Sequence, residues 1–320
     1  MAEFGLWGGS SAQSCDHRRS DLTARDPAAA NLRAFLKDAP ILPSVAVIIP
    51  ARNEALNLGA CLESVSQALT RAGVAAEVLV VDDDSTDSTA AVALTGGAKV
   101  LRQQPRRGPL SAWMLGVAST SASVLILVDA DCQVEPGAIA VLLAGLERSE
   151  VGVVAARSIP TSPGGRGGMI GRSARFSSLL LHRIKARLGD HDFVPIGRLM
   201  AVRRTAWAVE DRGLVPCDRA VAHQARTAGW EIVYAADALV FYEPVMTYRA
   251  LRADYLRTRA PGGRAIPAYD RIPPGLMWRA FGSSLLTSPL DAAAWATCRV
   301  ALLAQQRIRP RQAALSSWSG

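Results

Sequence analysis

The chain has 320 residues, of which 49% are hydrophobic, so it is long enough to bury a full core as one large globular domain or one domain with appendages. It carries 36 Lys and Arg against 28 Asp and Glu, a formal charge of +8. The five cysteines stand singly without a C-x-x-C pair, which argues against a zinc site or a disulfide framework and fits a reducing cytoplasm.

The two ends of the chain differ from its middle. Residues 1–43 mix Gly, Ser, Ala and charges without the apolar run of a signal peptide, so we expect a flexible N-terminal tail. Residues 241–320 hold eleven Arg against four acidic residues. Basic ends of this kind bind phosphates, nucleic acid or anionic lipid.

Between the ends, apolar runs with strand character alternate with segments of helical periodicity. The predicted strands are 45–49, 78–81, a short one near Val100, and 124–128; the predicted helices are 58–69, one from about Ser85, 110–117 and 138–146. Such alternation predicts an α/β fold with a mostly parallel sheet and helices on both faces.

The texture changes after Val151. We expect a strand at 151–155, a helix over 218–228 closed by Gly229, and a strand at 232–234. The Gly-rich segment 163–168 has almost no preferred conformation, and two interpretations stay open, a mobile lid and an inert surface loop.

Three of the predicted strands end in acidic residues. Asp82, Asp83 and Asp84 follow the second strand, and Asp129 and Asp131 follow the strand at 124–128. In parallel α/β sheets the carboxyl ends of the strands face one crevice, so these side chains are expected to converge with those after Ile49. The alternative is that the acids only cap the following helices.

Adjacent carboxylates repel one another and need a cation or hydrogen-bond donors close by. A nucleoside supplies donors, since an Asp can accept the imide N–H of a uracil while others hold ribose hydroxyls. Mg²⁺ and Mn²⁺ are bound by one or two carboxylates together with phosphate oxygens, which predicts Asp129 and Asp131 as metal ligands.

In these residues the chain resembles the family 2 glycosyltransferases of GT-A fold, from about Val45 to Pro244. The resemblance rests on three ordered motifs: Ile48-Ile49-Pro50-Ala51-Arg52-Asn53-Glu54, Val80-Val81-Asp82-Asp83-Asp84-Ser85-Thr86-Asp87, and Val128-Asp129-Ala130-Asp131. It implies an inverting, metal-dependent transfer of one sugar from a UDP- or GDP-linked donor to an acceptor hydroxyl of a glycan, a lipid-linked molecule or a small molecule.

The resemblance also implies roles for single residues on the donor side. Pro50, Ala51, Arg52 and Glu54 would line the nucleotide pocket, Asp82 or Asp83 would read the base, and Asp131 would meet the metal with Asp129 beside it. Arg107 precedes the helix before the third motif and falls on the donor side as well.

The second half continues the resemblance. The segment that begins with Gly197-Arg198 matches the acceptor side, and Cys217-Asp218 lies where members carry a Glu-Asp pair whose Asp is the catalytic base. The chain then divides into a nucleotide-binding half at 44–150, an acceptor half at 151–245 and a basic, helical extension at 246–320. The alternative interpretation of Asp218 is structural: an acidic residue that caps a helix or stabilises its first turn.

The chain departs from the family pattern at several positions. Cys217 replaces an acid, Asp84 replaces a Gly in a turn, and Trp113 stands where Asn is frequent. The segment ending in Arg257 lacks the Trp that follows this Arg in processive members such as cellulose synthases, which argues against polymerisation.

Arg257 and Arg259 precede a Gly-rich turn and are candidates to clamp the diphosphate, with a solvated basic face as the alternative. His182, His191 and His223 show no metal-ligand spacing and are read as structural. The apolar tail over 276–303 is interrupted by charges, so we expect it to pack on the domain or to lie at the inner face of a membrane without crossing it.

Three other functions have different sequence requirements. A nucleotidyltransferase would need a Gly-rich basic loop after the first strand, and a dehydrogenase would need G-x-G-x-x-G there, whereas this chain has Ala51-Arg52-Asn53-Glu54. A sugar-nucleotide-binding protein without turnover stays open because of Cys217 and Asp84. No nucleic-acid partner is predicted.

Overall fold

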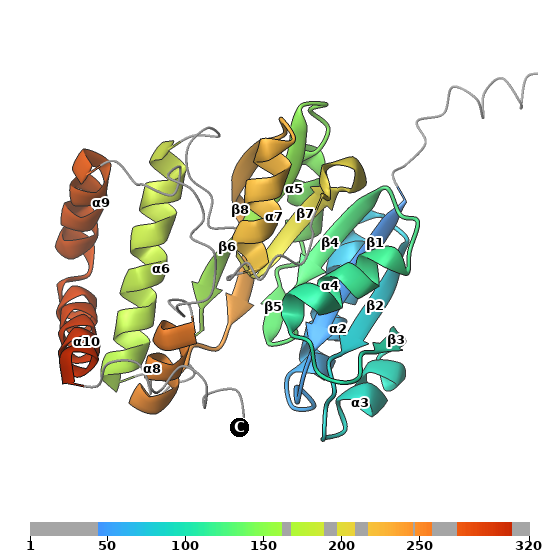
Figure 1. Cartoon of the computed structure of the whole chain (residues 1–320). Coiled ribbons are helices and arrows are strands. Elements are labelled where there is room, and N and C mark those ends of the chain that lie inside the picture. The colour runs from blue at the N-terminus through green and yellow to red at the C-terminus, as the bar shows by residue number, and fades with distance from the viewer. Residues whose placement is uncertain are drawn as a thin grey trace, which may run out of the picture. The chain divides into compact units, whose positions relative to one another are not determined.

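The computed structural model describes residues 44–161, 168–188, 197–208, 217–245, 247–257 and 274–308 (Figure 1). The expected N-terminal tail, nearly all of the Gly-rich segment 163–168, His191 and Arg259 lie outside the described residues. Gly168 alone of that segment is described, as the first residue of a helix.

Within this described part, eight strands form one sheet in the order β3-β2-β1-β4-β7-β6-β8-β5. Four of the strand pairings are parallel and three are antiparallel, because β7 runs against both of its neighbours and β5 runs against β8. The strands are β1 (Val45–Ala51), β2 (Ala76–Asp82), β3 (Lys99–Arg102), β4 (Val124–Val128), β5 (Cys132–Val134), β6 (Val151–Pro160), β7 (Leu199–Arg203) and β8 (Glu231–Tyr242).

Helices cover both faces of this sheet, as the alternating pattern predicts. The described helices are α2 (Leu58–Ala72), α3 (Thr89–Thr95), α4 (Pro109–Ala118), α5 (Ala138–Gly145), α6 (Gly168–Leu188), α7 (Cys217–Thr227), α8 (Tyr248–Arg257), α9 (Pro274–Thr287) and α10 (Pro289–Ile308). In β1, Val47 and Ile49 pack in the core that α2 and α5 close, while Ile48 packs with α4 on the other face. Burial on both faces explains why this strand is uninterrupted apolar sequence.

The helix α2 shows how local sequence sets an element. Its buried residues, among them Cys61, Val65 and Leu69, recur at helical spacing and face the sheet. The helix ends at Gly73, which takes a left-handed conformation with φ 66° and is therefore best served by a residue without a side chain.

Other elements differ from the sequence prediction. The helix expected from about Ser85 begins at Thr89, because residues 83–88 form a loop bonded to the loop after β1. The strands β6 and β8 are longer than expected and pair in parallel, with an irregularity in register between Ala156 and Arg157. The patterns in the sequence did not predict β5, β7 or α6.

A third layer of helices lies outside β6 and β8, seen at the left of Figure 1. There α6 packs against α9 and α10 around Phe176, Leu180 and Ile184. Arg175 of α6 donates two hydrogen bonds of 3.2 Å to the Asp291 carboxylate of α10, which fixes the two helices in register. Among the helices of the described residues, none is both long enough and apolar enough to span a bilayer.

Candidate functional site

The loops after β1 and β2 are joined by hydrogen bonds between them. The Asn53 N–H donates to Ser85 Oγ at 3.0 Å, and the Thr86 N–H donates to Asn53 Oδ1 at 2.9 Å. The Glu54 N–H donates to Thr89 Oγ1 at 2.8 Å. The polar residues after Ile49 and after Val81 therefore meet at one edge of the sheet, as expected.

Asp83 is held by the protein itself. Its Oδ1 accepts from Gln103 Nε2 at 2.6 Å and from the Arg107 N–H at 2.8 Å, and its Oδ2 accepts from the Gly108 N–H at 2.8 Å. The carboxylate is 4% exposed, and these bonds position the loop that leads into α4. The chain itself therefore supplies the hydrogen-bond donors that Asp83 needs beside the neighbouring carboxylates.

Asp82 and Asp84 take different parts in the same turn. Asp82 is buried, and its Oδ1 accepts from the Ser85 N–H at 3.0 Å. Asp84 has a φ of 62°, so the turn keeps the left-handed conformation for which Gly is suited although the residue is Asp. Which of Asp82 and Asp83 reads a base stays a prediction.

Asp129 and Asp131, which follow β4, contact Arg198, which directly precedes β7. Arg198 Nη1 lies 3.0 and 2.9 Å from the two Asp131 carboxylate oxygens and 3.5 Å from Asp129 Oδ2. The Asp129 N–H also donates to the Arg198 carbonyl at 3.0 Å, because β7 runs antiparallel to β4. The side chain of Cys132 completes a group of three whose ligand atoms lie within 4.8 Å of one another.

The electrostatics of Arg198 reflect this environment. Burial is the largest influence on its pKa and acts downward, but Asp131 and Asp129 act upward and raise the pKa above its ordinary value. The guanidinium also stacks 4.1 Å from the centre of the Tyr242 ring. Arg198 is therefore a fixed cation on the acid pair, a role that its acceptor-side assignment did not anticipate.

Glu54 links the first motif to the third. Burial raises the pKa of its carboxyl, its hydrogen bond from Asn57 Nδ2 at 2.9 Å opposes this, and the charge of Asp131 raises it further. The influence of Asp131 and Arg198 on Glu54 shows that residues after β1 and β4 lie in one electrostatic neighbourhood. The structure thus brings Glu54, Asp129, Asp131 and Arg198 together.

Two neighbouring arginines, Arg52 and Arg106, lie close to Asp83. Arg52 Nε is buried and has no hydrogen-bond partner among the described residues. Burial lowers the pKa of Arg106, the charge of Arg52 lowers it further, and Asp83 opposes both. Sequence reasoning chose Arg107, whose backbone N–H binds Asp83, and missed Arg106, although the Arg106-Arg107 pair was visible before the turn.

Asp218 lies in the first turn of α7 and is half-buried. Burial lowers the pKa of Lys185 in α6 to about 8, and Asp218 is the charge that opposes this shift, so the two side chains are electrostatic neighbours. No contact that joins Asp218 to Asp83 or Asp131 is described. The expectation that all three share one cavity stays a prediction.

The remaining predicted residues are placed as follows. Pro50 and Ala51 end β1, and the Ala51 carbonyl accepts from the Asp83 N–H at 2.9 Å. A Cβ at Gly197 would lie 2.8 Å from Ser158 Oγ, so any larger residue here would require the Ser158 hydroxyl to move. Arg257 is the last residue of α8, while its side chain and that of Cys217 lie outside the description.

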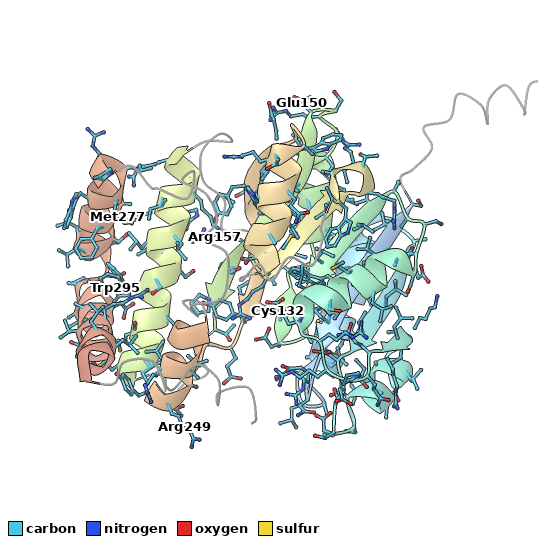
Figure 2. All side chains as sticks on the ribbon, viewed as in Figure 1. Cys132, Glu150, Arg157, Arg249, Met277 and Trp295 are labelled. Carbon is cyan, nitrogen blue, oxygen red and sulfur yellow. The ribbon has the colours of Figure 1, made fainter. Side chains whose placement is uncertain are left out.

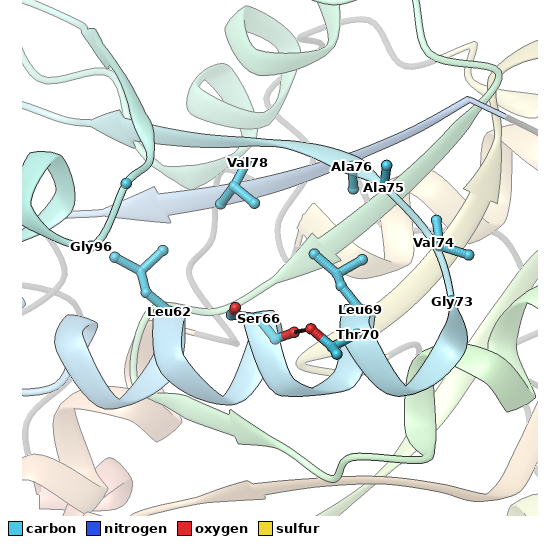
Figure 3. Close-up of a pocket in the computed structure, with 11 residues that line it drawn as sticks. Leu62, Ser66, Leu69, Thr70, Gly73, Val74, Ala75, Ala76, Val78 and Gly96 are labelled. Carbon is cyan, nitrogen blue, oxygen red and sulfur yellow. Dashed lines mark hydrogen bonds between the residues drawn. The ribbon is translucent and has the colours of Figure 1, made fainter.

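One pocket of the described residues lies away from these side chains (Figure 3). It is lined by α2, by the residues that lead into β2, and by the Gly96-Gly97 turn. This is the opposite end of β2 from Asp82, so the pocket belongs to the amino-terminal edge of the strands and not to the acidic edge.

The fold and the acidic edge define a GT-A-type α/β protein, and comparison with known proteins gives its family. The family model described as glycosyl transferase family 2 matches residues 46–208, about half of the chain. The chain belongs to this family and is a glycosyltransferase.

Individual relatives agree with this assignment. An uncharacterized glycosyltransferase of Mycobacterium tuberculosis strain H37Rv is 32% identical over 194 residues, which are 59% of this chain and 82% of the relative. The 4,4'-diaponeurosporenoate glycosyltransferase of Staphylococcus haemolyticus is 41% identical over 96 residues, 28% of this chain and 24% of the relative.

A solved structure shares the fold. The mannosyltransferase of Pyrobaculum calidifontis in complex with GDP-Man and Mn²⁺ superposes with a TM-score of 0.54 at 18% identity. The match covers 91% of this chain and 84% of that one. The similarity establishes the GT-A architecture.

Proposed function

We propose that the chain transfers one sugar from a UDP- or GDP-linked donor to an acceptor hydroxyl with inversion at the anomeric carbon. The observation that carries this is the gathering of Glu54, Asp129, Asp131 and Arg198 at the carboxyl edge of the sheet, from β1, β4 and β7. The Pyrobaculum mannosyltransferase, which has the same fold, was solved with GDP-Man and Mn²⁺, and this supports a nucleotide sugar and a divalent metal here.

The acid pair fits a divalent cation. Asp129 and Asp131 offer carboxylate oxygens close together, and Arg198 Nη1 lies within 3.0 Å of both Asp131 oxygens, which supports a preference of the pair for positive charge. Oxygen ligands of this kind are those that Mg²⁺ and Mn²⁺ prefer. When bound, such a metal supplies charge neutralisation to the departing diphosphate.

The residues of this chain then have separate tasks in the transfer. The acceptor oxygen forms a bond to the anomeric carbon, and its proton passes to the Asp218 carboxylate. The bond between the anomeric carbon and the diphosphate oxygen breaks, and its electron pair stays on the departing diphosphate. Single displacement of this kind inverts the anomeric centre. Arg52 and Arg106 lie on the donor side, and Arg257 and Arg259 are proposed to hold phosphate oxygens as well.

A thermal-shift panel of UDP- and GDP-sugars with Mn²⁺ or Mg²⁺ tests donor and metal together. A true donor at 100 times its dissociation constant should stabilise the fold by about 2.7 kcal/mol, and only when metal is present. Asp131→Asn should abolish the metal-dependent part, whereas the exposed Asp237→Asn should keep it. Absence of any nucleotide-sugar effect on the wild-type chain would refute the proposal.

Release of nucleoside diphosphate separates an enzyme from a binding protein without turnover. We expect slow, metal-dependent hydrolysis of the correct donor by the wild-type chain. Binding without any release over many hours would favour the non-catalytic alternative, and use of a nucleoside triphosphate with a sugar phosphate would favour a nucleotidyltransferase.

The outer helices α9 and α10 have surface features that support a contact with membrane lipid. Large apolar side chains are exposed on α9 and α10: Trp278 is 70% exposed, Leu286 85%, Leu290 67% and Val300 66%. Apolar side chains beside arginines such as Arg279 and Arg299 are typical of helices that lie in a membrane interface. Such a contact would suit a lipid-linked acceptor and a position at the inner face of the membrane.

Flotation with anionic liposomes tests this contact. The wild-type chain should float with the liposomes, and a Trp278→Ser, Leu286→Ser double variant should stay in the dense fraction. Leu94→Ser is the matched control, because Leu94 of α3 is 64% exposed but lies outside the outer helices. Equal flotation of the double variant and the wild-type chain would reject the contact.

A further inference from the structure

A cluster of cationic and polar side chains lies between α6 and the sheet, apart from the acid pair. His182 and Lys185 come from α6, Arg157 from β6 and Tyr234 from β8. Lys185 Nζ lies 4.9 Å from the centre of the Tyr234 ring, and His182 Nδ1 lies 3.0 Å from the Tyr234 hydroxyl. Figure 2 labels Arg157 between α6 and the sheet.

Burial of the Lys185 side chain at this position is energetically unfavourable. It is one of three lysines in a chain with 33 arginines, and it is 8% exposed. Within the described residues its ammonium forms no hydrogen bond or ion pair and has only the face of the Tyr234 ring. Burial lowers its pKa to about 8, and the charge of Asp218 works against that shift. Removal of an ammonium group from water disfavours its charged form unless an anion lies close to it.

Arg157 adds a second cation without an acceptor. Its Nε is buried, and no hydrogen-bond partner for it is present among the described residues. Its charge lowers the pKa of His182, after burial, and it also acts on Tyr234, whose pKa burial raises to about 12. Arg157 therefore lies close to both the imidazole and the phenol.

The charges around this cluster do not balance. Arg183 also faces His182 electrostatically, but its guanidinium donates to Thr287 of α9 at 3.0 Å. Arg157, whose buried Nε has no partner among the described residues, and Lys185 both act electrostatically on His182, with Asp218 as the acid that acts on Lys185. Two cations gathered around one imidazole in this way are stabilised by an anion placed between them.

We propose that Arg157 and Lys185, with the Tyr234 hydroxyl, bind an anionic group of the acceptor, either a phosphate or a carboxylate. This inference rests on the proposed transfer function, because it takes Asp218 as the group that accepts the proton of the acceptor hydroxyl. Guanidinium and ammonium donors recognise both anions, the former in a bidentate manner.

The position of Asp218 restricts the acceptor further. Since Asp218 is an electrostatic neighbour of Lys185, the anion lies close to the hydroxyl that receives the sugar. A phosphorylated alcohol, a hydroxy acid or a phosphorylated lipid headgroup has this geometry, whereas a neutral glycan has no group for the two cations.

Binding of inorganic phosphate to the full chain, measured by calorimetry at constant ionic strength, tests the site. We expect saturable binding that Lys185→Met and Arg157→Gln each weaken at least tenfold. One control should keep the wild-type affinity: Lys99→Met, which alters an exposed lysine paired with Glu77. Lys185→Met keeps an unbranched apolar side chain that can fill the same space, so the variant should fold.

Competition then distinguishes the sources of the anion. Displacement of phosphate by glycerol phosphate or glycerate, but not by glycerol, indicates a soluble acceptor, and displacement only by phosphatidylglycerol vesicles indicates a lipid headgroup; both support the inference. No saturable phosphate binding, or equal affinity in Lys185→Met and the wild-type chain, overturns it and leaves Lys185 as a side chain that only positions Asp218.

The outcome is separable from that of the proposed function. Nucleotide-sugar binding without phosphate binding removes the anion site and leaves the transferase proposal standing. Phosphate binding that depends on Lys185 without any nucleotide-sugar binding leaves an anion site in a chain that lacks the proposed activity.

Discussion

Replacement of Asp218 by Asn should lower the rate of sugar transfer about 10²- to 10⁴-fold, the contribution typical of a general base. The amide has nearly the shape of the carboxylate but cannot take the acceptor's proton. Donor affinity should be unchanged, because none of the proposed donor contacts comes from α7. Single-turnover rates together with nucleotide-sugar titrations measure the two effects.

The same variant separates catalysis from helix capping. Asp218 lies in the first turn of α7, where the charge contributes only about 0.3 to 1 kcal/mol, so Asp218→Asn should unfold near the wild-type temperature. The matched comparison is Asp237→Asn, an exposed acid in β8, which should affect neither rate nor stability. Retention of more than a third of the wild-type rate in Asp218→Asn would show that Asp218 is only a first-turn acid.

The Asp83→Ala substitution should lower the free energy of unfolding by about 3 to 5 kcal/mol, because three donors lose a charged acceptor in a buried place. Those donors are Gln103 Nε2 and the N–H groups of Arg107 and Gly108, all within 2.8 Å of the carboxylate. Urea unfolding followed by far-UV circular dichroism gives the value.

Asp237→Ala is the control for this measurement, since it removes an exposed carboxylate and should leave the midpoint close to that of the wild-type chain. A loss below about 1 kcal/mol in Asp83→Ala would mean that water replaces the carboxylate, since an unsatisfied buried donor alone costs at least that much. The structural role here assigned to Asp83 would then be wrong.

The sequence predicted the elements whose signals are local. The strands β1, β2 and β4 are short buried runs, and α2 has a regular apolar face with Gly73 after it. These patterns depend on neighbouring residues alone, and the structure confirms them. The order of such elements predicted an α/β fold with a mostly parallel sheet, and the resemblance of the three motifs to family 2 glycosyltransferases implied the GT-A class.

The elements that the sequence reading lacked depend on distant partners. Much of α6 is polar, and its apolar side chains gain their partners from α9 and α10 more than a hundred residues later. The strand β7 becomes a strand because β4 and β6 flank it. Neither requirement is visible in a local window of sequence.

The site shows the same division. Asp129 and Asp131 were recognisable because they follow a buried strand directly, whereas the contact of Arg198 with Asp131 joins residues 67 positions apart. His182 was read as structural, and its bond to Tyr234 is consistent with that reading. Lys185 drew no attention in the sequence, because only the fold reveals that its ammonium is buried.

Strand β7 connects the two regions of chemical interest. In the part of the chain that the structure describes, β7 lies between β4 and β6 in the sheet and pairs with both. At its start, Arg198 touches the acid pair while Gly197 fits against Ser158, the residue after Arg157. A displacement of this one strand would therefore be felt at the acid pair and at the end of β6 that carries Arg157 at the same time, so the backbone around residue 198 is the mechanical link between them.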